Sequence, residues 1–294
     1  MSEPMRVRIT SEGADLAVRD FGGEGEAVVL LHGGPGVPDY LAAVAEMLEP
    51  QYRTITFDQR GVGSSMASRH RYELDDYLGD LEAVRQGLGL ASMHLFGHSW
   101  GGLFAQAYAQ RFPDCVRSLF LASPSGGLGE QWKATQREVF RFNRRQSGAV
   151  GFAAMGLWQT LMFLPQPLGD AGARRLMRRV WRNYFRDARE APPANEEWLR
   201  GVHSEAMLAT TKALGSVPAE TLDGLARAPQ LPALVLFGRN DIYETSPQVT
   251  RSRLPDARHV VLEGSGHLPW LQDPAGFRAV ISDFYGITAV PDVV

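Results

Sequence analysis

A serine lies at the centre of the pentapeptide Gly97-His98-Ser99-Trp100-Gly101. The pattern G-x-S-x-G is typical of a nucleophilic serine held on a tight turn between a strand and a helix. The apolar run at 93–96 predicts that strand, and residues 100–112 predict the helix. Because the amide groups at a helix N-terminus stabilise negative charge, Ser99 is predicted to attack a carbonyl carbon.

A serine hydroxyl is a weak nucleophile at neutral pH, so this chemistry needs a general base and an acid that orients the base. On such a strand–turn–helix scaffold the chain order is serine, acid, histidine. Asp241 follows the apolar run 233–237, and His267 follows the run 258–262. Ser99, Asp241 and His267 are therefore the predicted catalytic residues, and Glu244 and Asp223 are the alternatives for the acid.

A glycine-rich segment, His32-Gly33-Gly34-Pro35-Gly36, follows another apolar run at 27–31. Glycines allow a backbone to approach a substrate closely, and paired N–H groups stabilise the oxyanion that forms during attack on a carbonyl. The predicted donors are the amide of Trp100 and the amide of Gly34, with Gly33 as the alternative to Gly34. His32 is expected to hold the loop through side-chain hydrogen bonds.

The elements that must position these residues follow from the apolar periodicity of the chain. Strands are expected at 5–10, 15–20, 27–31, 52–57, 93–96, 116–122, 233–237 and 258–262, and helices at 40–48, 74–88, 100–112 and 274–285. Residues 124–228 lack strand runs, and helices are expected there at 132–145, 172–186 and 196–213.

Strands that alternate with helices indicate an α/β fold with a mostly parallel central sheet flanked by helices. The interruption by helices predicts an inserted helical cap. We expect a core domain made of residues 1–123 and 229–294, and a cap domain made of residues 124–228. The cap segment carries 15 Lys and Arg against 10 Asp and Glu, so it is basic although the chain as a whole is not.

Composition excludes several classes of protein. The 294 residues include 30 Lys and Arg against 33 Asp and Glu, a net charge of −3, which argues against a nucleic-acid partner. The single cysteine, Cys115, excludes an intrachain disulfide and a Cys-rich zinc site. No apolar run is long enough for a membrane span or a signal peptide, so a cytoplasmic protein without a membrane partner is expected. The serine chemistry itself requires no metal and no organic cofactor.

Five segments together carry a resemblance to a known family. They are HGGPG at 32–36, DQRGVGSS at 58–65, GHSWGG at 97–102, GRND at 238–241 and GSGH at 264–267. The chain resembles the proline iminopeptidase-like branch of the α/β-hydrolase superfamily. This resemblance implies the α/β-hydrolase fold and cleavage of an amide bond at the free N-terminus of a short peptide. It also implies that Asp58 and Arg60 border the site and stabilise the loop at 32–36.

In that family, carboxylates of the cap bind the substrate's ammonium group, and the resemblance makes Glu205 and Glu244 the candidates here, with Glu196 and Glu197 as further ones. Trp270, three residues after His267, is expected to line an aromatic and apolar pocket. A carboxylesterase, a lactonase or an amino-acid amidase with the same three catalytic residues remains an alternative. So does a ligand-binding protein of the same fold without activity. The partner is a small molecule or short peptide, and the sequence does not predict the oligomeric state.

Overall fold

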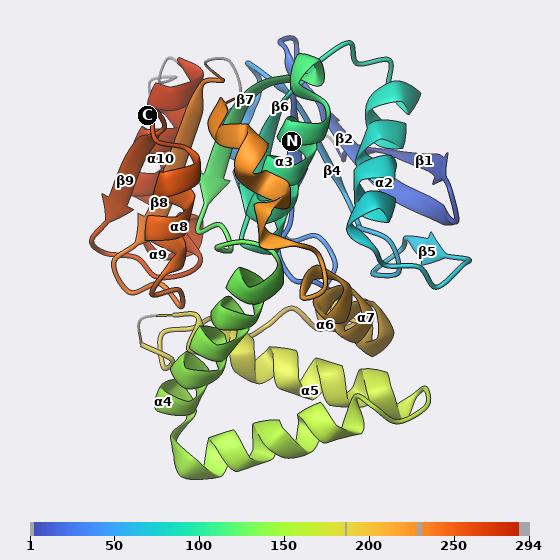
Figure 1. Cartoon of the computed structure of the whole chain (residues 1–294), viewed down its shortest axis with the longest axis vertical. Helices are drawn as coiled ribbons and strands as arrows, with labels where there is room; N and C mark the ends of the chain where they lie inside the picture. Colours follow the sequence, from blue (N-terminus) through green and yellow to red (C-terminus); the bar gives the residue numbers. More distant parts are fainter. Residues whose placement is uncertain (1–2, 186, 228–230, 288–294) are drawn as a thin grey trace.

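The computed structural model describes residues 3–185, 187–227 and 231–287, and a nine-stranded sheet lies at its centre (Figure 1). The strands are β1 (Met5–Ser11), β2 (Ala14–Gly22), β3 (Ala27–Leu31), β4 (Arg53–Phe57), β5 (Met66–Ala67), β6 (Met93–His98), β7 (Val116–Ala122), β8 (Ala233–Gly238) and β9 (Arg258–Leu262). Their order is β1-β2-β4-β3-β6-β7-β8-β9, with β5 paired to β2. All pairs from β4 to β9 are parallel, and those of β2 are antiparallel.

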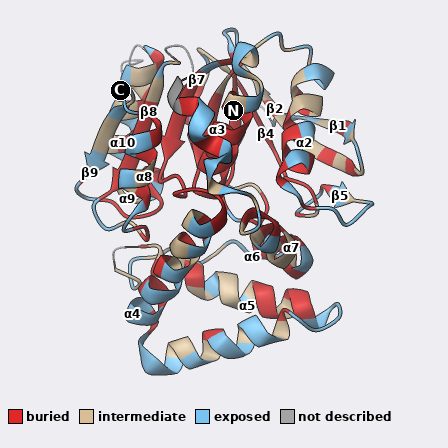
Figure 2. Cartoon of the chain, viewed as in Figure 1, coloured by how far each residue is buried: buried red, intermediate tan, exposed pale blue. Residues whose placement is uncertain are grey.

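Helices cover both faces of the sheet, and two apolar clusters fill the space between the layers. Side chains on a strand alternate between faces, so Val29 and Leu31 pack with α2 (Leu74–Gly87) and α3 (Trp100–Arg111). Val28 and Leu30 pack with α1 (Ala42–Leu48) and α10 (Pro274–Tyr285). Burial on both sides explains the apolar runs of the central strands, which are buried along most of their length in Figure 2. The predicted α/β-hydrolase fold is confirmed.

Four helices lie between β7 and β8 in the chain, and we call them the cap helices. They are α4 (Gly129–Leu161), α5 (Leu168–Asn183), α6 (Glu196–Arg200) and α7 (Ser204–Leu214). Figure 1 shows them beyond the edge of the sheet toward which the arrowheads of β7 and β9 point. A division into separate core and cap domains stays a prediction, and its boundary at 228/229 lies outside the described residues.

Some helices differ from their predicted bounds. The expected helix 196–213 is two helices, because Gly63 N–H donates to Gly201 C=O at 2.9 Å and His203 N–H donates to Gly36 C=O at 3.1 Å. These contacts draw residues 201–203 out of a helical path. α4 extends well beyond the expected 132–145 and bends at Gly148, where φ is 63° and ψ is 178°. Residue 186, the expected end of the helix 172–186, lies outside the described residues.

Three short elements were not predicted: the strand β5 and the helices α8 (Ser246–Arg253) and α9 (Pro269–Gln272). Their sequences have few apolar residues in a regular period, and local hydrogen bonds define them instead. Two short 3₁₀ helices, η1 (Pro113–Cys115) and η2 (Ala219–Arg227), also connect longer elements.

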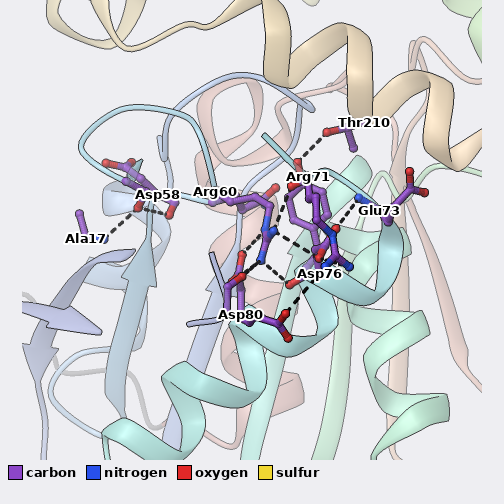
Figure 3. A network of polar contacts seen from close by, with 12 residues as sticks. Ala17, Asp58, Arg60, Arg71, Glu73, Asp76, Asp80 and Thr210 are labelled. Carbon is purple, nitrogen blue, oxygen red and sulfur yellow. Dashed lines mark hydrogen bonds and ion pairs between the residues drawn. The ribbon is translucent and has the colours of Figure 1, made fainter. Parts of the chain in front are cut away.

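A buried ion-pair network anchors the segment that follows β4 to the helix α2 (Figure 3). The guanidinium of Arg60 donates to both carboxylate oxygens of Asp80 at 2.7 Å, and to the carbonyl of Asp76 at 2.9 Å. Both partners of the pair with Asp80 are only 1% exposed. A buried charge without its partner is costly, so this network holds the backbone around Arg60 in one place.

Candidate active site

The side chains that could take part in a reaction lie at one edge of the sheet. Because β3, β6, β7, β8 and β9 are parallel neighbours, their carboxyl ends all meet at that edge. The loops that follow these strands carry, in turn, His32, Ser99, Ser123, Asp241 and His267. This edge faces the cap helices in Figure 1.

Ser99 occupies a strained turn between β6 and α3. Its φ of 56° and ψ of −120° lie outside the regions that L-residues usually adopt. The position two residues before Ser99 must be glycine, because a Cβ on Gly97 would lie 2.5 Å from the carbonyl oxygen of Gly101. Such strain persists only where the surroundings fix it, and it is common at reactive residues. The turn places the Ser99 side chain in the cavity described below.

His267 and Asp241 form a buried pair. The Nδ1 of His267 lies 3.0 Å from Oδ1 of Asp241, and both side chains are at most 3% exposed. The other carboxylate oxygen, Oδ2, accepts a hydrogen bond from the hydroxyl of Ser123. Because Nδ1 donates its proton to Asp241, Nε2 carries a lone pair. Among the described residues this Nε2 has no hydrogen-bond partner, so it can accept a proton.

Ser123 holds the acid in place at some cost in backbone strain. Its φ is 47°, an unusual value for a residue other than glycine. Its N–H donates to the carbonyl of Leu236 on β8 at 2.7 Å. Sequence reasoning missed Ser123, although its place directly after β7 is the same signal that pointed to Asp241 after β8.

Tyr243 contacts the serine directly. Its hydroxyl lies 2.9 Å from Oγ of Ser99 and 2.8 Å from Oγ of Ser125. Its ring meets the imidazole of His267 edge-on, with centroids 5.1 Å apart. Burial raises the pKa of Tyr243 to about 12, so the phenol keeps its proton at neutral pH. Sequence reasoning missed this residue too, although it lies in the loop of Asp241.

The loop after β3 aims a backbone amide at the site. Nδ1 of His32 donates to the carbonyl of Gly33 at 2.8 Å. In a planar trans peptide the C=O of Gly33 and the N–H of Gly34 point in opposite directions, so this bond also orients the Gly34 amide. No described residue accepts a hydrogen bond from the amides of Gly34 or Trp100. Both amides are therefore available to an oxyanion.

Gln59 connects the loop after β3 to Trp100 at the start of α3. Its backbone N–H donates to Nε2 of His32 at 3.1 Å, and its side-chain amide donates to the carbonyl of His32 at 2.8 Å. Its side-chain oxygen accepts from the indole of Trp100 at 2.8 Å. Burial lowers the pKa of His32, which keeps the imidazole neutral with Nε2 free to accept. Gln59 thus supports the loop at 32–36, whereas the resemblance implied this role for Asp58 and Arg60. Arg60 binds Asp80 on α2, and Asp58 binds Arg19, so their support of the loop stays a prediction.

Ser99 and His267 line a cavity of about 320 Å³ whose described walls contain no Asp, Glu, Lys or Arg. The cap helices supply most of this lining, and the sheet edge supplies the reactive groups. The apolar lining residues are Val37, Val139, Phe140, Phe152, Met155, Met162, Leu176, Met177, Val180, Met207, Leu208, Ile242 and Leu268. The uncharged polar residues that line it besides Ser99 are Gln136, Asn143, Gln159 and Thr211, together with the aromatic residues Tyr40, Tyr184, Tyr243, Trp181 and Trp198.

The three predicted substrate-binding residues do not line this cavity. Glu205 is half-exposed at the start of α7 and pairs with His70 at 2.7 Å. Glu244 is half-exposed and pairs with Arg145 at 3.1 Å. Trp270 is buried beneath the cavity wall, with its ring 4.8 Å from that of His98. The expectation that Trp270 lines the pocket is therefore wrong, because Trp270 belongs to the apolar cluster under the sheet edge. Binding of a substrate's ammonium group by Glu205 or Glu244 stays a prediction.

Neither a cluster of metal-ligating side chains nor a membrane-spanning helix is present in residues 3–185, 187–227 and 231–287, the described part of the chain. Within them, no three Cys, His, Asp or Glu side chains are grouped so that they could hold a metal ion. Within the same ranges, no helix combines the length and apolar character that crossing a membrane requires.

Comparison with known proteins identifies relatives along nearly the whole chain. Residues 26–274 match the family model described as alpha/beta hydrolase fold. The chain is 29% identical over 283 residues to a proline iminopeptidase of Heyndrickxia coagulans, covering 90% of this chain and 92% of the relative. It is 28% identical over 292 residues to the proline iminopeptidase of Lactobacillus delbrueckii subsp. lactis, covering 94% of this chain and 92% of the relative.

Solved structures share the fold. VinJ superposes with a TM-score of 0.75 and 22% identity, covering 98% of this chain and all of that chain. A thermophilic esterase from Thermogutta terrifontis superposes with a TM-score of 0.66 and 24% identity, covering 96% of this chain and 98% of that chain. At these identities the likeness extends to the fold and no further.

Proposed function

The chain belongs to the α/β-hydrolase fold family and is a hydrolase, and from that premise we propose that it cleaves an ester or amide through an acyl-enzyme on Ser99. The observation that carries this proposal is that Ser99, His267 and Gly34 line one cavity, with Asp241 paired to His267 behind it. The amides of Gly34 and of Trp100, the residue after Ser99, donate to no described residue. Each group has the role that acyl transfer requires.

The proposed reaction has two halves. Oγ of Ser99 attacks the substrate carbonyl carbon while Nε2 of His267 takes the hydroxyl proton, and the amides of Gly34 and Trp100 stabilise the oxyanion. The protonated His267 then gives that proton to the leaving alcohol or amine, and the acyl group stays on Ser99. Water attacks the acyl-enzyme with His267 again as the base, which releases the acid and restores the serine. Asp241 keeps the imidazole in the tautomer that leaves Nε2 free.

The walls of the cavity indicate the class of substrate. A charged group moved from water into an apolar site is strongly disfavoured unless an opposite charge meets it. The described lining carries no charged side chain, and it is rich in Met, Phe, Leu and Val. We therefore propose an ester or amide whose acyl group is uncharged and largely apolar, bound through contacts with the cap helices.

Cleavage of a proline or another residue from a free N-terminus is the second candidate. Relatives that cover about nine-tenths of this chain are named proline iminopeptidases, which favours it. Against it, Glu205 and Glu244 are not among the residues that line the cavity, and they contact His70 and Arg145 instead. An N-terminal ammonium group would then have only uncharged polar residues, such as Gln136 and Asn143, as partners.

Labelling with a fluorophosphonate tests the acyl-enzyme. We expect one adduct, on Ser99, and neither adduct nor turnover in Ser99→Ala. Ser125→Ala, which removes a nearby buried serine outside the proposed reaction, is the matched control and should still be labelled. Turnover by Ser99→Ala equal to that of the wild type would overturn the proposal, and an unlabelled, inactive wild type would favour a ligand-binding protein.

A substrate panel separates the two candidates. It should contain p-nitrophenyl esters of increasing acyl length, an aliphatic amide, a homoserine lactone and proline p-nitroanilide. Higher kcat/KM on the esters or the amide than on the proline anilide supports the uncharged substrate. Glu205→Gln and Glu244→Gln should change kcat/KM by less than about two-fold, since exposed ion pairs contribute little. If the anilide leads and either variant raises its KM ten-fold or more, the peptidase is correct.

A further inference from the structure

Two side chains that the reaction above does not use, the partly buried Tyr40 and the buried His98, join the oxyanion loop to the loop of the general base. The amide of Gly33 lies 2.9 Å from the hydroxyl of Tyr40, to which it donates. That hydroxyl lies 2.6 Å from Nδ1 of His98, and Nε2 of His98 lies 2.8 Å from the carbonyl oxygen of His267. The chain of contacts therefore runs from one catalytic loop, past the residue before Ser99, to the other.

The donor and acceptor properties of these groups determine the direction of each hydrogen bond in this series. The carbonyl of His267 can only accept, so Nε2 of His98 carries a proton. Burial and the nearby His267 lower the pKa of His98 well below its usual value, so Nδ1 carries none. Tyr40 must then donate to Nδ1, and its oxygen accepts from Gly33. Burial raises the pKa of Tyr40 well above 10, so this phenol keeps its proton.

The two ends of this series of hydrogen bonds lie next to the groups that are proposed to act on the substrate. Gly33 precedes Gly34, whose amide is a proposed oxyanion donor. The carbonyl at the other end belongs to His267 itself. Since a catalytic group displaced by about 1 Å can lose about 100-fold in rate, the spacing between these two loops matters to the reaction. We propose that Tyr40 and His98 are positioning residues that fix the Gly34 amide and the His267 imidazole relative to each other.

Close packing around the link supports this proposal, which rests on the proposed acyl-enzyme reaction. A Cβ on Gly33 would lie 2.3 Å from the Tyr40 hydroxyl and 3.1 Å from Nδ1 of His98. Trp270 stacks on the ring of Tyr40 and meets that of His98 edge-on, with centroids 6.2 and 4.8 Å apart. The packing against Trp270 holds the rings of Tyr40 and His98 in place. A variant of either residue that loses only a polar atom should therefore keep its side chain in the same position.

Conservative variants on either side can break the contact between Tyr40 and His98. Tyr40→Phe removes the hydroxyl, and His98→Gln keeps a donor near the His267 carbonyl while losing the acceptor for Tyr40. We expect each to lower kcat on the best ester by about 10- to 100-fold, with KM changed less than about three-fold. Because both variants break the same contact, the double variant should be no slower than either single one.

Two measurements distinguish positioning from a purely structural role. Rates are divided by the concentration of active sites titrated with fluorophosphonate, so loss of folded protein does not count. A boronic acid that forms a tetrahedral adduct on Ser99 should bind the variants more weakly in proportion to their loss of kcat/KM. Tyr52→Phe is the control, since its hydroxyl donates to the carbonyl of Tyr285 at 2.7 Å, at the other end of the strands.

The outcomes separate this inference from the function on which it rests. An active wild type with variants of unchanged kcat per active site would overturn the positioning role, even if their melting temperatures fell. So would losses that multiply in the double variant. A wild type that is not labelled on Ser99 would instead refute the acyl-enzyme itself.

Discussion

The hydroxyl of Ser99 is hydrogen-bonded to Tyr243, at 2.9 Å, while Nε2 of His267 has no partner among the described residues. Either hydroxyl can be the donor in this contact. Where Ser99 donates to Tyr243, the serine proton points away from His267, so in the proposed reaction this contact competes with proton transfer to Nε2.

Removing the Tyr243 hydroxyl should make Ser99 more reactive toward a small reagent. In Tyr243→Phe the ring against His267 remains, and the serine has only Nε2 of His267 to bond. One neutral hydrogen bond contributes roughly 1 kcal/mol, so the rate of inactivation by a small fluorophosphonate should rise about five-fold. Ser125→Ala keeps the contact between Tyr243 and Ser99 and should change this rate less than two-fold, about the limit of detection. A slower reaction in Tyr243→Phe would contradict this account.

Asp241→Asn should be nearly inactive although the fold is kept. The asparagine amide would face Nδ1 of His267 and favour the tautomer with the proton on Nε2, which can no longer act as a base. We expect kcat to fall by about 10⁴-fold, as for other enzymes in which the acid of such a triad is replaced by its amide.

The matched variant is Ser123→Ala, which removes only the hydrogen bond to Oδ2 of Asp241 and leaves the contact with His267. Its kcat should fall about ten-fold, since a single supporting bond contributes roughly 1 kcal/mol. If both variants lost the same activity, the tautomer would not be the cause.

Acid should destabilise the fold through two buried histidines of the site, His32 and His98. Burial lowers the pKa of His32 and of His98, so both stay neutral when folded. The unfolded chain takes up their protons below about pH 6.5, so stability is complete above that pH and declines below it. Each histidine contributes a slope of up to about 1.4 kcal/mol per pH unit.

Urea unfolding of the wild type and His98→Gln at about pH 7 and about pH 5.5 checks this expectation. Between these two pH values the free energy of unfolding should fall more in the wild type than in His98→Gln. The difference should be no larger than the contribution of the one proton that His98 takes up on unfolding. The buried carboxyls of Asp39 and Asp80 have raised pKa values and act in the opposite direction, but they are common to both proteins. Equal losses would mean that His98 is not held neutral by the fold.

Filling the far part of the cavity should select against long acyl groups. Met155 is buried, lines the cavity and lies on the second half of α4, which Figure 1 places far from the sheet. Met155→Trp should lower kcat/KM for p-nitrophenyl octanoate about ten-fold or more and leave the acetate within about two-fold, because lost apolar contacts of one methylene already matter. Unchanged octanoate activity in a variant of normal melting temperature would place the acyl group elsewhere.

The reactive residues were the most predictable part of this protein. Ser99, Asp241 and His267 each lie in the loop after a parallel strand, so a local pattern determines at which sheet edge their side chains meet. The chain order of the three excludes most alternatives. Gly34 and Trp100 follow from the same logic. Their roles in catalysis stay predictions until the variants above are measured.

The cavity walls were far less predictable, for a physical reason. The resemblance implies Glu205 and Glu244 as ligands of an ammonium group, but in the fold they contact His70 and Arg145, which are distant in sequence, at the surface. The break at residues 201–203 likewise depends on hydrogen bonds to Gly36 and Gly63, which no periodicity reveals. Tyr243 and Tyr40 look like ordinary core aromatics until the fold brings their hydroxyls to Ser99 and His98.

The place at which the cap helices join the sheet gives the protein a modular design. They leave the sheet after β7 and return before β8, so Ser99, Asp241 and His267 all lie on elements outside that insertion. Most of the walls that meet the substrate belong to the insertion. Exchange of the continuous segment between β7 and β8 would therefore change the lining of the cavity, and with it the proposed substrate selectivity, while Ser99, Asp241 and His267 keep their places.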